Sequence, residues 1–224
     1  VLAVQKKLIH KANLMGRPVI TATQMLESMT GNIRPTRAEV TDVANAILDG
    51  TDAVMLSEET AVGLYPVEAA KMAVKIARSI ERQRNAFSAG WNLPDFWQRE
   101  FGNKRSTVED TISLAVMKAL QTLNIRLVLT PTRSGSTPRH ICRFKPDRWV
   151  IAFTGDEKVR NFLALSYGVY PVLISNEQES LHEKMLDFVR DSGLAARGDK
   201  LILTEGIKPG LRGGTNSMKI ITLT

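Results

Sequence analysis

Two stretches of the sequence combine small hydroxyl residues, glycines and cations, a combination suited to binding a phosphate group. Residues 130–139 read TPTRSGSTPR and residues 206–215 read GIKPGLRGGT. Small residues allow consecutive backbone N–H groups to converge on an anion, a helix start adds partial positive charge, and Arg133 and Arg139 add full charges. An ordinary Ser/Thr helix cap explains the first stretch equally well, and a glycine hairpin without a ligand explains the second.

A third candidate is residues 20–28, ITATQMLES, which end one apolar run and continue beyond it. In a parallel barrel the carboxyl ends of the strands hold the active site. Four polar side chains could therefore reach a substrate: Thr21, Thr23, Gln24 and Glu27. The residues alone favour a simpler interpretation, a capped turn.

Three carboxylates flank the next apolar run: Asp52, Glu58 and Glu59. Paired carboxylates can bind a metal or exchange protons. Exposed carboxylates at a helix start are more often caps, and we favour that interpretation. The histidines are far apart in the sequence, each in a predicted helix, and show neither metal-ligand spacing nor a nucleophile–base pattern: His10, His140 and His182. We predict no metal site in this chain.

The elements that position these stretches alternate between strand and helix. Short apolar runs at 18–22 and 52–56 predict buried strands, and residues 35–48 and 66–84 predict helices. Thr36 and Glu39 have the spacing of a helix N-cap and capping box. Strand and helix in alternation indicate an α/β fold with parallel strands. Two strands cannot make a well-covered sheet, so this part is typical of the tail of a larger barrel.

The alternation resumes after residue 105 and is longer. The pattern predicts helices at 108–123, 138–144, 157–165 and 179–192, and strands at 126–130, 149–153, 169–173, 200–204 and 218–223. Five strands interleaved with helices predict a doubly wound domain. The overall expectation is a partial TIM-barrel segment (1–84), an aromatic-rich linker (85–105) and a doubly wound five-stranded domain (106–224).

Composition limits the functional classes. The chain has 224 residues, 43% of them hydrophobic, and a net charge of +7, which suits an anionic ligand. The basic residues are dispersed, so nucleic-acid binding is disfavoured. The single cysteine, Cys142, excludes an internal disulfide and is expected to be a buried helix residue. Without a membrane-spanning run or a signal peptide, we expect a soluble cytoplasmic protein. Val1 in place of an initiator Met suggests processing or a longer parent chain.

Three motifs resemble pyruvate kinase: VITATQMLESM at 19–29, RPTRAEVTDVANAILDGTDAVMLSEETAVGLYPVEA at 34–69, and GGTNSMK at 213–219. The resemblance implies the last two strands of a (β/α)8 catalytic barrel followed by the complete carboxyl-terminal regulatory domain. Family enzymes of glycolysis transfer a phosphoryl group from phosphoenolpyruvate to ADP with Mg²⁺ and K⁺, and they are generally homotetramers.

The resemblance also implies how the catalytic residues are divided. The essential lysine, the ligands of both metals and the main ADP contacts would lie upstream of this chain. Of the catalytic residues only Thr23 would be present, so this chain alone is expected to be inactive. Glu58 stands where the family usually has glycine, which puts the geometry of that turn in question.

In the second domain the resemblance implies an effector site for a phosphate group. The residues it implies are Thr132, Arg133, Ser134, Gly135, Ser136, Thr137, Arg139, Lys208, Gly210, Arg212 and Gly213. Fructose-bisphosphate-regulated members hold the second phosphate with a tryptophan and an arginine, which residues 174–181 lack. This acidic stretch favours a sugar or nucleotide monophosphate, such as ribose 5-phosphate or AMP. The alternative is a stand-alone module that binds phosphorylated metabolites or a protein partner.

Overall fold

The computed structural model describes residues 2–87, 106–174, 181–206 and 214–224. The chain divides into two compact units, Val1–Asn103 and Lys104–Thr224. Among the described residues, no helix has the length and apolar character needed to cross a membrane.

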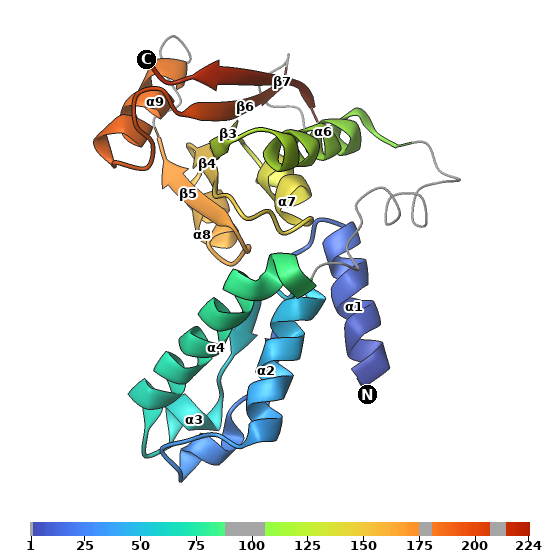
Figure 1. Cartoon of the computed structure of the whole chain (residues 1–224), viewed down its shortest axis with the longest axis vertical. Helices are drawn as coiled ribbons and strands as arrows, with labels where there is room; N and C mark the ends of the chain where they lie inside the picture. The colour runs from blue at the N-terminus through green and yellow to red at the C-terminus, as the bar shows by residue number, and fades with distance from the viewer. Residues whose placement is uncertain (1, 88–105, 175–180, 207–213) are drawn as a thin grey trace. The chain divides into compact units, whose positions relative to one another are not determined.

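The first unit combines a two-stranded parallel sheet with helices. Its elements are α1 (Leu2–Leu14), β1 (Ile20–Ala22), the 3₁₀ helix η1 (Glu27–Thr30), α2 (Arg37–Asp49), β2 (Ala53–Met55), α3 (Glu58–Ala61) and α4 (Pro66–Phe87) (Figure 1). The two strands are parallel, with Ile20 opposite Ala53. Thr36 caps α2 and forms the predicted capping box with Glu39.

The core of the first unit lies between α2, α4 and the segment that follows β1. Leu26, Met29 and Val43 are fully buried there against the apolar face of α4. The strands themselves are less buried than predicted: Ile20 is 47% exposed, and only Thr21 of β1 is buried. The prediction of buried strands at 18–22 and 52–56 is therefore wrong in this unit, because each described strand pairs only with the other and leaves an edge uncovered.

The second unit has the predicted doubly wound architecture. Its elements are α6 (Val108–Thr122), β3 (Ile125–Pro131), α7 (Ser136–Cys142), β4 (Val150–Thr154), α8 (Glu157–Leu163), β5 (Val169–Leu173), α9 (Leu181–Asp191), β6 (Lys200–Gly206) and β7 (Thr215–Thr222). The sheet order is β5-β4-β3-β6-β7, with β7 antiparallel to β6 and the rest parallel. All five strands were predicted from the sequence.

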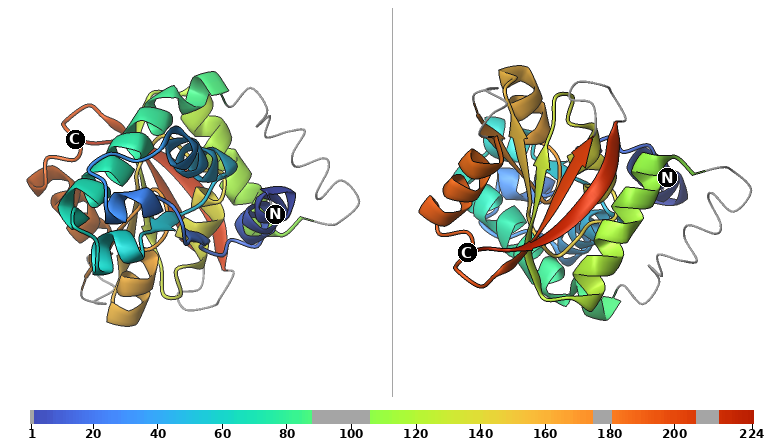
Figure 2. Two further views of the ribbon diagram at one scale, coloured as in Figure 1. Left: turned by 90° about the horizontal axis from the view of Figure 1, so that it is seen from below. Right: turned by 90° about the horizontal axis from the view of Figure 1, so that it is seen from above.

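Helices cover both faces of this sheet, as Figure 2 shows from above. Because side chains alternate along a strand, Val128 packs with α6, α7 and α8 on one face, while Leu127 and Leu129 pack with α9 on the other. Cys142 is buried in α7, as predicted. Both anion-binding candidates follow neighbouring parallel strands, β3 and β6. They therefore begin side by side, at the carboxyl ends of these strands.

Candidate functional site

The segment after β1 has an unusual backbone. Thr23 and Gln24 have φ values of +69° and +55°, although neither is glycine. A β-branched residue such as threonine rarely adopts positive φ, and such strain concentrates at functional positions. Thr23 is exposed, and its hydroxyl donates a hydrogen bond to the carbonyl of Ala22 at 2.7 Å. The structure therefore gives the predicted catalytic threonine a backbone that only its surroundings can maintain.

Glu39 of α2 supplies part of that support. Its carboxylate accepts hydrogen bonds from the N–H and hydroxyl of Ser28 and from the N–H and hydroxyl of Thr36. Burial alone would raise the pKa of Glu39, but these hydrogen bonds outweigh it and hold the pKa below its usual value. The Glu39 carboxylate thus links η1 to the start of α2 by hydrogen bonds.

Glu59 and Asp52 also hold backbone rather than ligands. The two oxygens of Glu59 accept hydrogen bonds from the N–H of Leu26 at 2.9 Å and of Ser57 at 2.6 Å. Asp52 accepts one from the N–H of Val19 at 2.8 Å. Glu59 is only 1% exposed, so the expectation of an exposed carboxylate is wrong there. The reason is that Glu59 satisfies amide groups of both segments that follow the strands.

Glu58 begins α3 and is exposed, and its φ is not positive. The glycine that the resemblance leads one to expect at this position is therefore not required by this turn. Glu58 also fits the electrostatics of a helix start, where a carboxylate faces the positive end of the peptide dipoles.

The loop after β3 is shaped by its own hydrogen bonds. The N–H of Thr132 donates to the carbonyl of Phe153 at 2.8 Å, and the Thr132 hydroxyl accepts a bond from the N–H of Gly135 at 2.9 Å. Gly135 has φ +74°, and a Cβ there would lie 3.0 Å from the Leu163 side chain. The positive φ thus favours glycine, and a Cβ at this position would press on the Leu163 side chain.

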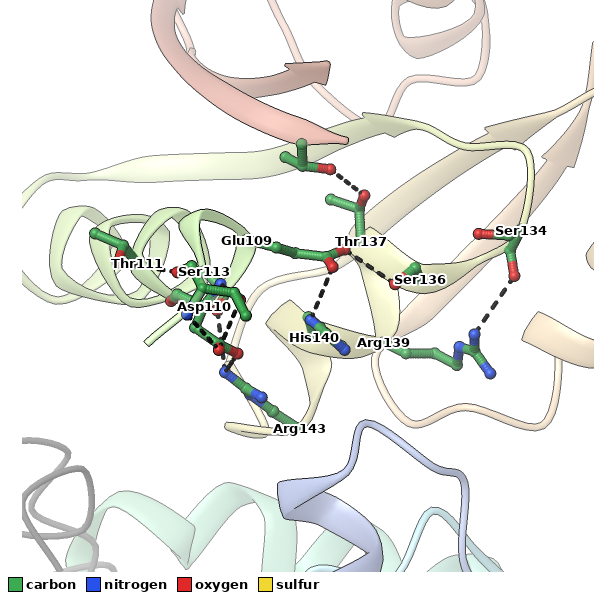
Figure 3. Close-up of polar contacts among 12 residues, drawn as sticks. Glu109, Asp110, Thr111, Ser113, Ser134, Ser136, Thr137, Arg139, His140 and Arg143 are labelled. Carbon is green, nitrogen blue, oxygen red and sulfur yellow. Dashed lines mark hydrogen bonds and ion pairs between the residues drawn. The ribbon is translucent and has the colours of Figure 1, made fainter. Parts of the chain in front are cut away.

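Three backbone donors of this loop have no hydrogen-bond partner among the residues that the structure describes. Within the described part of the chain, the N–H groups of Ser134, Ser136 and Thr137 make no hydrogen bond. The guanidinium of Arg139 donates hydrogen bonds to the carbonyls of Ser134 (Figure 3) and Gly135. It also lies 5.0 Å from the centre of the Phe162 ring. Arg139, which we expected to add charge to a phosphate site, therefore binds carbonyl groups of the loop itself.

Part of the predicted second loop is described. The hydroxyls of Thr137 in α7 and Thr215 at the start of β7 are hydrogen-bonded, so the two candidate loops meet at this point. The predicted phosphate contacts in the second loop lie outside the described residues: Lys208, Gly210, Arg212 and Gly213. So do residues 175–180, most of the stretch that lacks the tryptophan and arginine, and the predicted linker from 88 to 105.

A buried acid that the sequence analysis did not identify lies beside the first loop. Glu109, in the first turn of α6, accepts a hydrogen bond from the Ser136 hydroxyl at 3.0 Å. Its other oxygen lies 3.4 Å from Nδ1 of His140, and its side chain is only 8% exposed. Burial lowers the pKa of His140, and this effect exceeds the opposing influence of Glu109. At neutral pH the imidazole is therefore neutral.

The next residue of α6 forms a stronger link to the same helix. Asp110 pairs with the guanidinium of Arg143 at 2.8 Å, and it also accepts hydrogen bonds from the N–H and hydroxyl of Thr107. Burial alone would raise the pKa of Asp110, but these donors hold it below its usual value. Burial lowers the pKa of Arg143 against the effect of Asp110. Of the two acids in the first turn of α6, Glu109 thus binds α7 and Asp110 binds the residue that caps its carboxyl end (Figure 3).

Sequence reasoning found the loop and missed these acids. Glu109 and Ser136 are 27 positions apart, and only the fold brings them together. The one available signal was the pattern Thr107-Val-Glu-Asp110, which marks a capping box. The histidines lie on the separate helices predicted for them, α1, α7 and α9.

Comparison with known proteins identifies relatives over nearly the whole chain. The family model of the pyruvate kinase barrel domain matches residues 1–70, and that of the pyruvate kinase alpha/beta domain matches residues 110–221. The chain is 51% identical to a pyruvate kinase of Thermococcus litoralis over 221 residues and 40% identical to one of Clostridium acetobutylicum over 219 residues. These alignments cover 98% and 97% of this chain and 45% of each relative.

A solved pyruvate kinase structure also matches the chain. The crystal structure of a pyruvate kinase from Cryptosporidium parvum matches with a TM-score of 0.84 and 33% sequence identity, and the match covers 100% of this chain and 43% of that one. The chain therefore spans less than half the length of these relatives.

Proposed function

Because the chain belongs to the pyruvate kinase family, we propose that it is the carboxyl-terminal portion of an enzyme that transfers a phosphoryl group from phosphoenolpyruvate to ADP. The observation that carries this proposal is the consecutive match of both domain models, in family order, to the two parts of the chain. The parent enzyme would be a homotetramer, and the present chain would contribute Thr23 to its active site.

The geometry around Thr23 supports that assignment. Two consecutive residues with positive φ follow β1, and Glu39 and Glu59 hold the segment beyond them with three hydrogen bonds, one from Leu26 and two from Ser28. A backbone held in this way after a strand can present a side chain to a substrate or a water molecule in a fixed position. Thr23 would be a positioning group for substrate or water.

Mg²⁺ and K⁺ are the metals that the family resemblance implies. Among the described residues no cluster of three or more histidine, cysteine, aspartate or glutamate side chains could hold a metal ion. Asp52 and Glu59 are committed to backbone N–H groups. These residues do not fit a Mg²⁺ site, and we assign no step to a metal in this chain.

We further propose that the second unit binds the phosphate group of a sugar or nucleotide monophosphate. Three observations support this: three N–H groups of the loop after β3 have no partner among the described residues, a glycine permits the shape of the loop, and the loop contacts the start of β7. The loop would bind with its amides, while Arg139 would maintain its shape.

Calorimetry tests the effector proposal directly. Ribose 5-phosphate and AMP titrated into the folded chain should bind with a Kd on the order of micromolar. Ser136→Asp should abolish the heat, because it places a negative charge beside the loop, and Arg139→Ala should weaken binding. Ser79→Asp, an identical charge change on the exposed face of α4 in the other unit, is the matched control and should bind normally. No heat with either compound would remove the proposal.

The division of catalytic residues has its own test. The chain mixed with phosphoenolpyruvate, ADP, Mg²⁺ and K⁺, in an assay coupled to pyruvate reduction, should show no turnover. An appreciable rate would mean that the charge-stabilising groups lie within this chain.

A further inference from the structure

Ser136 belongs both to the loop after β3 and to the buried cluster beneath it. Its N–H is one of the unpartnered donors, while its hydroxyl donates to Oε1 of Glu109 at 3.0 Å. Oε2 of the same carboxylate lies 3.4 Å from Nδ1 of His140 (Figure 3). Anything that redirects the Ser136 hydroxyl therefore acts on Glu109, and through it on His140.

We infer that an anion bound by the loop competes with Glu109 for the Ser136 hydroxyl, and that His140 takes up a proton when Glu109 loses this donor. The inference rests on the phosphate site proposed above. A hydroxyl carries one proton and can donate it to one acceptor at a time. A buried carboxylate that loses a donor is destabilised, and an imidazolium at 3.4 Å would compensate it.

The cluster is arranged so that the proton is absent before the anion arrives. Burial lowers the pKa of His140, and Arg139 of the same helix and Arg143 directly after it add to that effect, while Glu109 and Asp110 of α6 oppose it. Of the strands packed against α7, β4 has no ionisable side chain and β5 has only Tyr170. A bound anion and a less compensated Glu109 both favour the charged imidazole.

Glu109 cannot simply follow the hydroxyl. The neighbouring Asp110 fixes the first turn of α6 through its capping box with Thr107 and its ion pair with Arg143. We therefore assign the compensation to a proton rather than to movement of the helix. By linkage, anion binding would be tighter at lower pH, and a shift of about one pKa unit in His140 would correspond to about a tenfold change in affinity.

Sulfate is the suitable probe, because it resembles a phosphate group but does not itself titrate between about pH 5 and 8, where histidine does. We expect the imidazole NMR signal of His140 to titrate about one unit higher with saturating sulfate than without it, and sulfate affinity to rise as the pH falls. The His10 signal, from the other unit, is the internal control for ionic strength.

Two variants distinguish a relay through Ser136 and Glu109 from a direct electrostatic effect of the anion on His140. In Ser136→Ala the pKa of His140 should already be raised without sulfate, and most of the sulfate-induced shift should be lost. Glu109→Gln should leave sulfate binding nearly independent of pH. If Ser136→Ala keeps the full sulfate-induced shift, the anion acts on His140 through space and the relay is wrong.

The remaining outcomes separate this inference from the function on which it rests. Sulfate binding without any change in the pKa of His140 overturns the relay and leaves the phosphate site intact. Failure of sulfate, ribose 5-phosphate and AMP to bind the folded chain overturns both.

Discussion

Replacing Arg143 with methionine should destabilise the second unit strongly. The guanidinium lies 2.8 Å from the Asp110 carboxylate, and the two side chains are only 4% and 10% exposed. Methionine keeps most of the apolar stem but removes the charge, so Asp110 remains buried without its cationic partner. Removing one member of a buried ion pair costs roughly 3–5 kcal/mol.

The structure places the cost near the lower end of that range. Asp110 retains the hydrogen bonds from the N–H and hydroxyl of Thr107, at 3.0 and 2.7 Å, which continue to stabilise its charge. We therefore expect the free energy of unfolding of this unit to fall by about 3 kcal/mol, which corresponds to roughly 10 °C in Tm for a unit of this size.

Urea unfolding followed by circular dichroism measures this effect. Arg190→Met is the matched control, because Arg190 and Asp187 form an exposed pair that should contribute less than about 1 kcal/mol. The hydrogen bonds that lower the pKa of Asp110 stabilise the fold above its ordinary value of 3.8 and lose effect as the pH falls through the lower folded value. The Arg143→Met penalty should therefore be full at neutral pH and shrink in acid. A penalty equal to that of Arg190→Met would refute the reasoning.

Three further substitutions test other parts of the structure. Gly135→Ala should cost about 1–2 kcal/mol in urea unfolding and weaken ribose 5-phosphate binding, because alanine resists positive φ. Glu59→Gln should cost about 2 kcal/mol, since its amide nitrogen would face a backbone N–H, whereas Glu58→Gln should be neutral; equal costs would contradict this. Because burial lowers the pKa of His140, the unfolded chain takes up this proton before the folded chain does, and the free energy of unfolding falls below about pH 6.5. His140→Gln should therefore reduce the dependence of the free energy of unfolding on pH between pH 7 and 5. An unchanged dependence would exclude His140 as its source.

Local sequence signals predicted the helices and strands better than they predicted the burial of those elements. Apolar runs bounded by turn residues gave all five strands of the second unit, and Thr36 with Glu39 gave the start of α2. The same signals overestimated the burial of β1, because burial depends on which strands lie alongside and not on the strand itself. The start of α7 was predicted two residues late, since Pro138 lies in its first turn rather than at its first position.

In the candidate site, too, local features were predicted and long-range contacts were not. Hydroxyls and a glycine at a strand end were enough to predict the loop that contains Ser136. Positive φ at Thr23 could not be predicted, because threonine itself disfavours it. Glu39 was predicted only as a cap, yet its carboxylate also binds Ser28 from another segment. Long-range partners of this kind leave no local pattern in the sequence.

The first turn of α6 places two acids on α7 with different consequences. Asp110 accepts a charged donor at 2.8 Å and two further hydrogen bonds, so its contacts are saturated and fix the distance between the helices. Glu109 has one neutral hydroxyl donor and an imidazole at 3.4 Å that burial keeps uncharged. A pair of this kind, one rigid and one short of donors, converts the loss of a single hydroxyl into a change of protonation rather than a movement. Anion binding by the loop is therefore coupled to pH through Glu109. The stability of the unit depends on pH through Asp110.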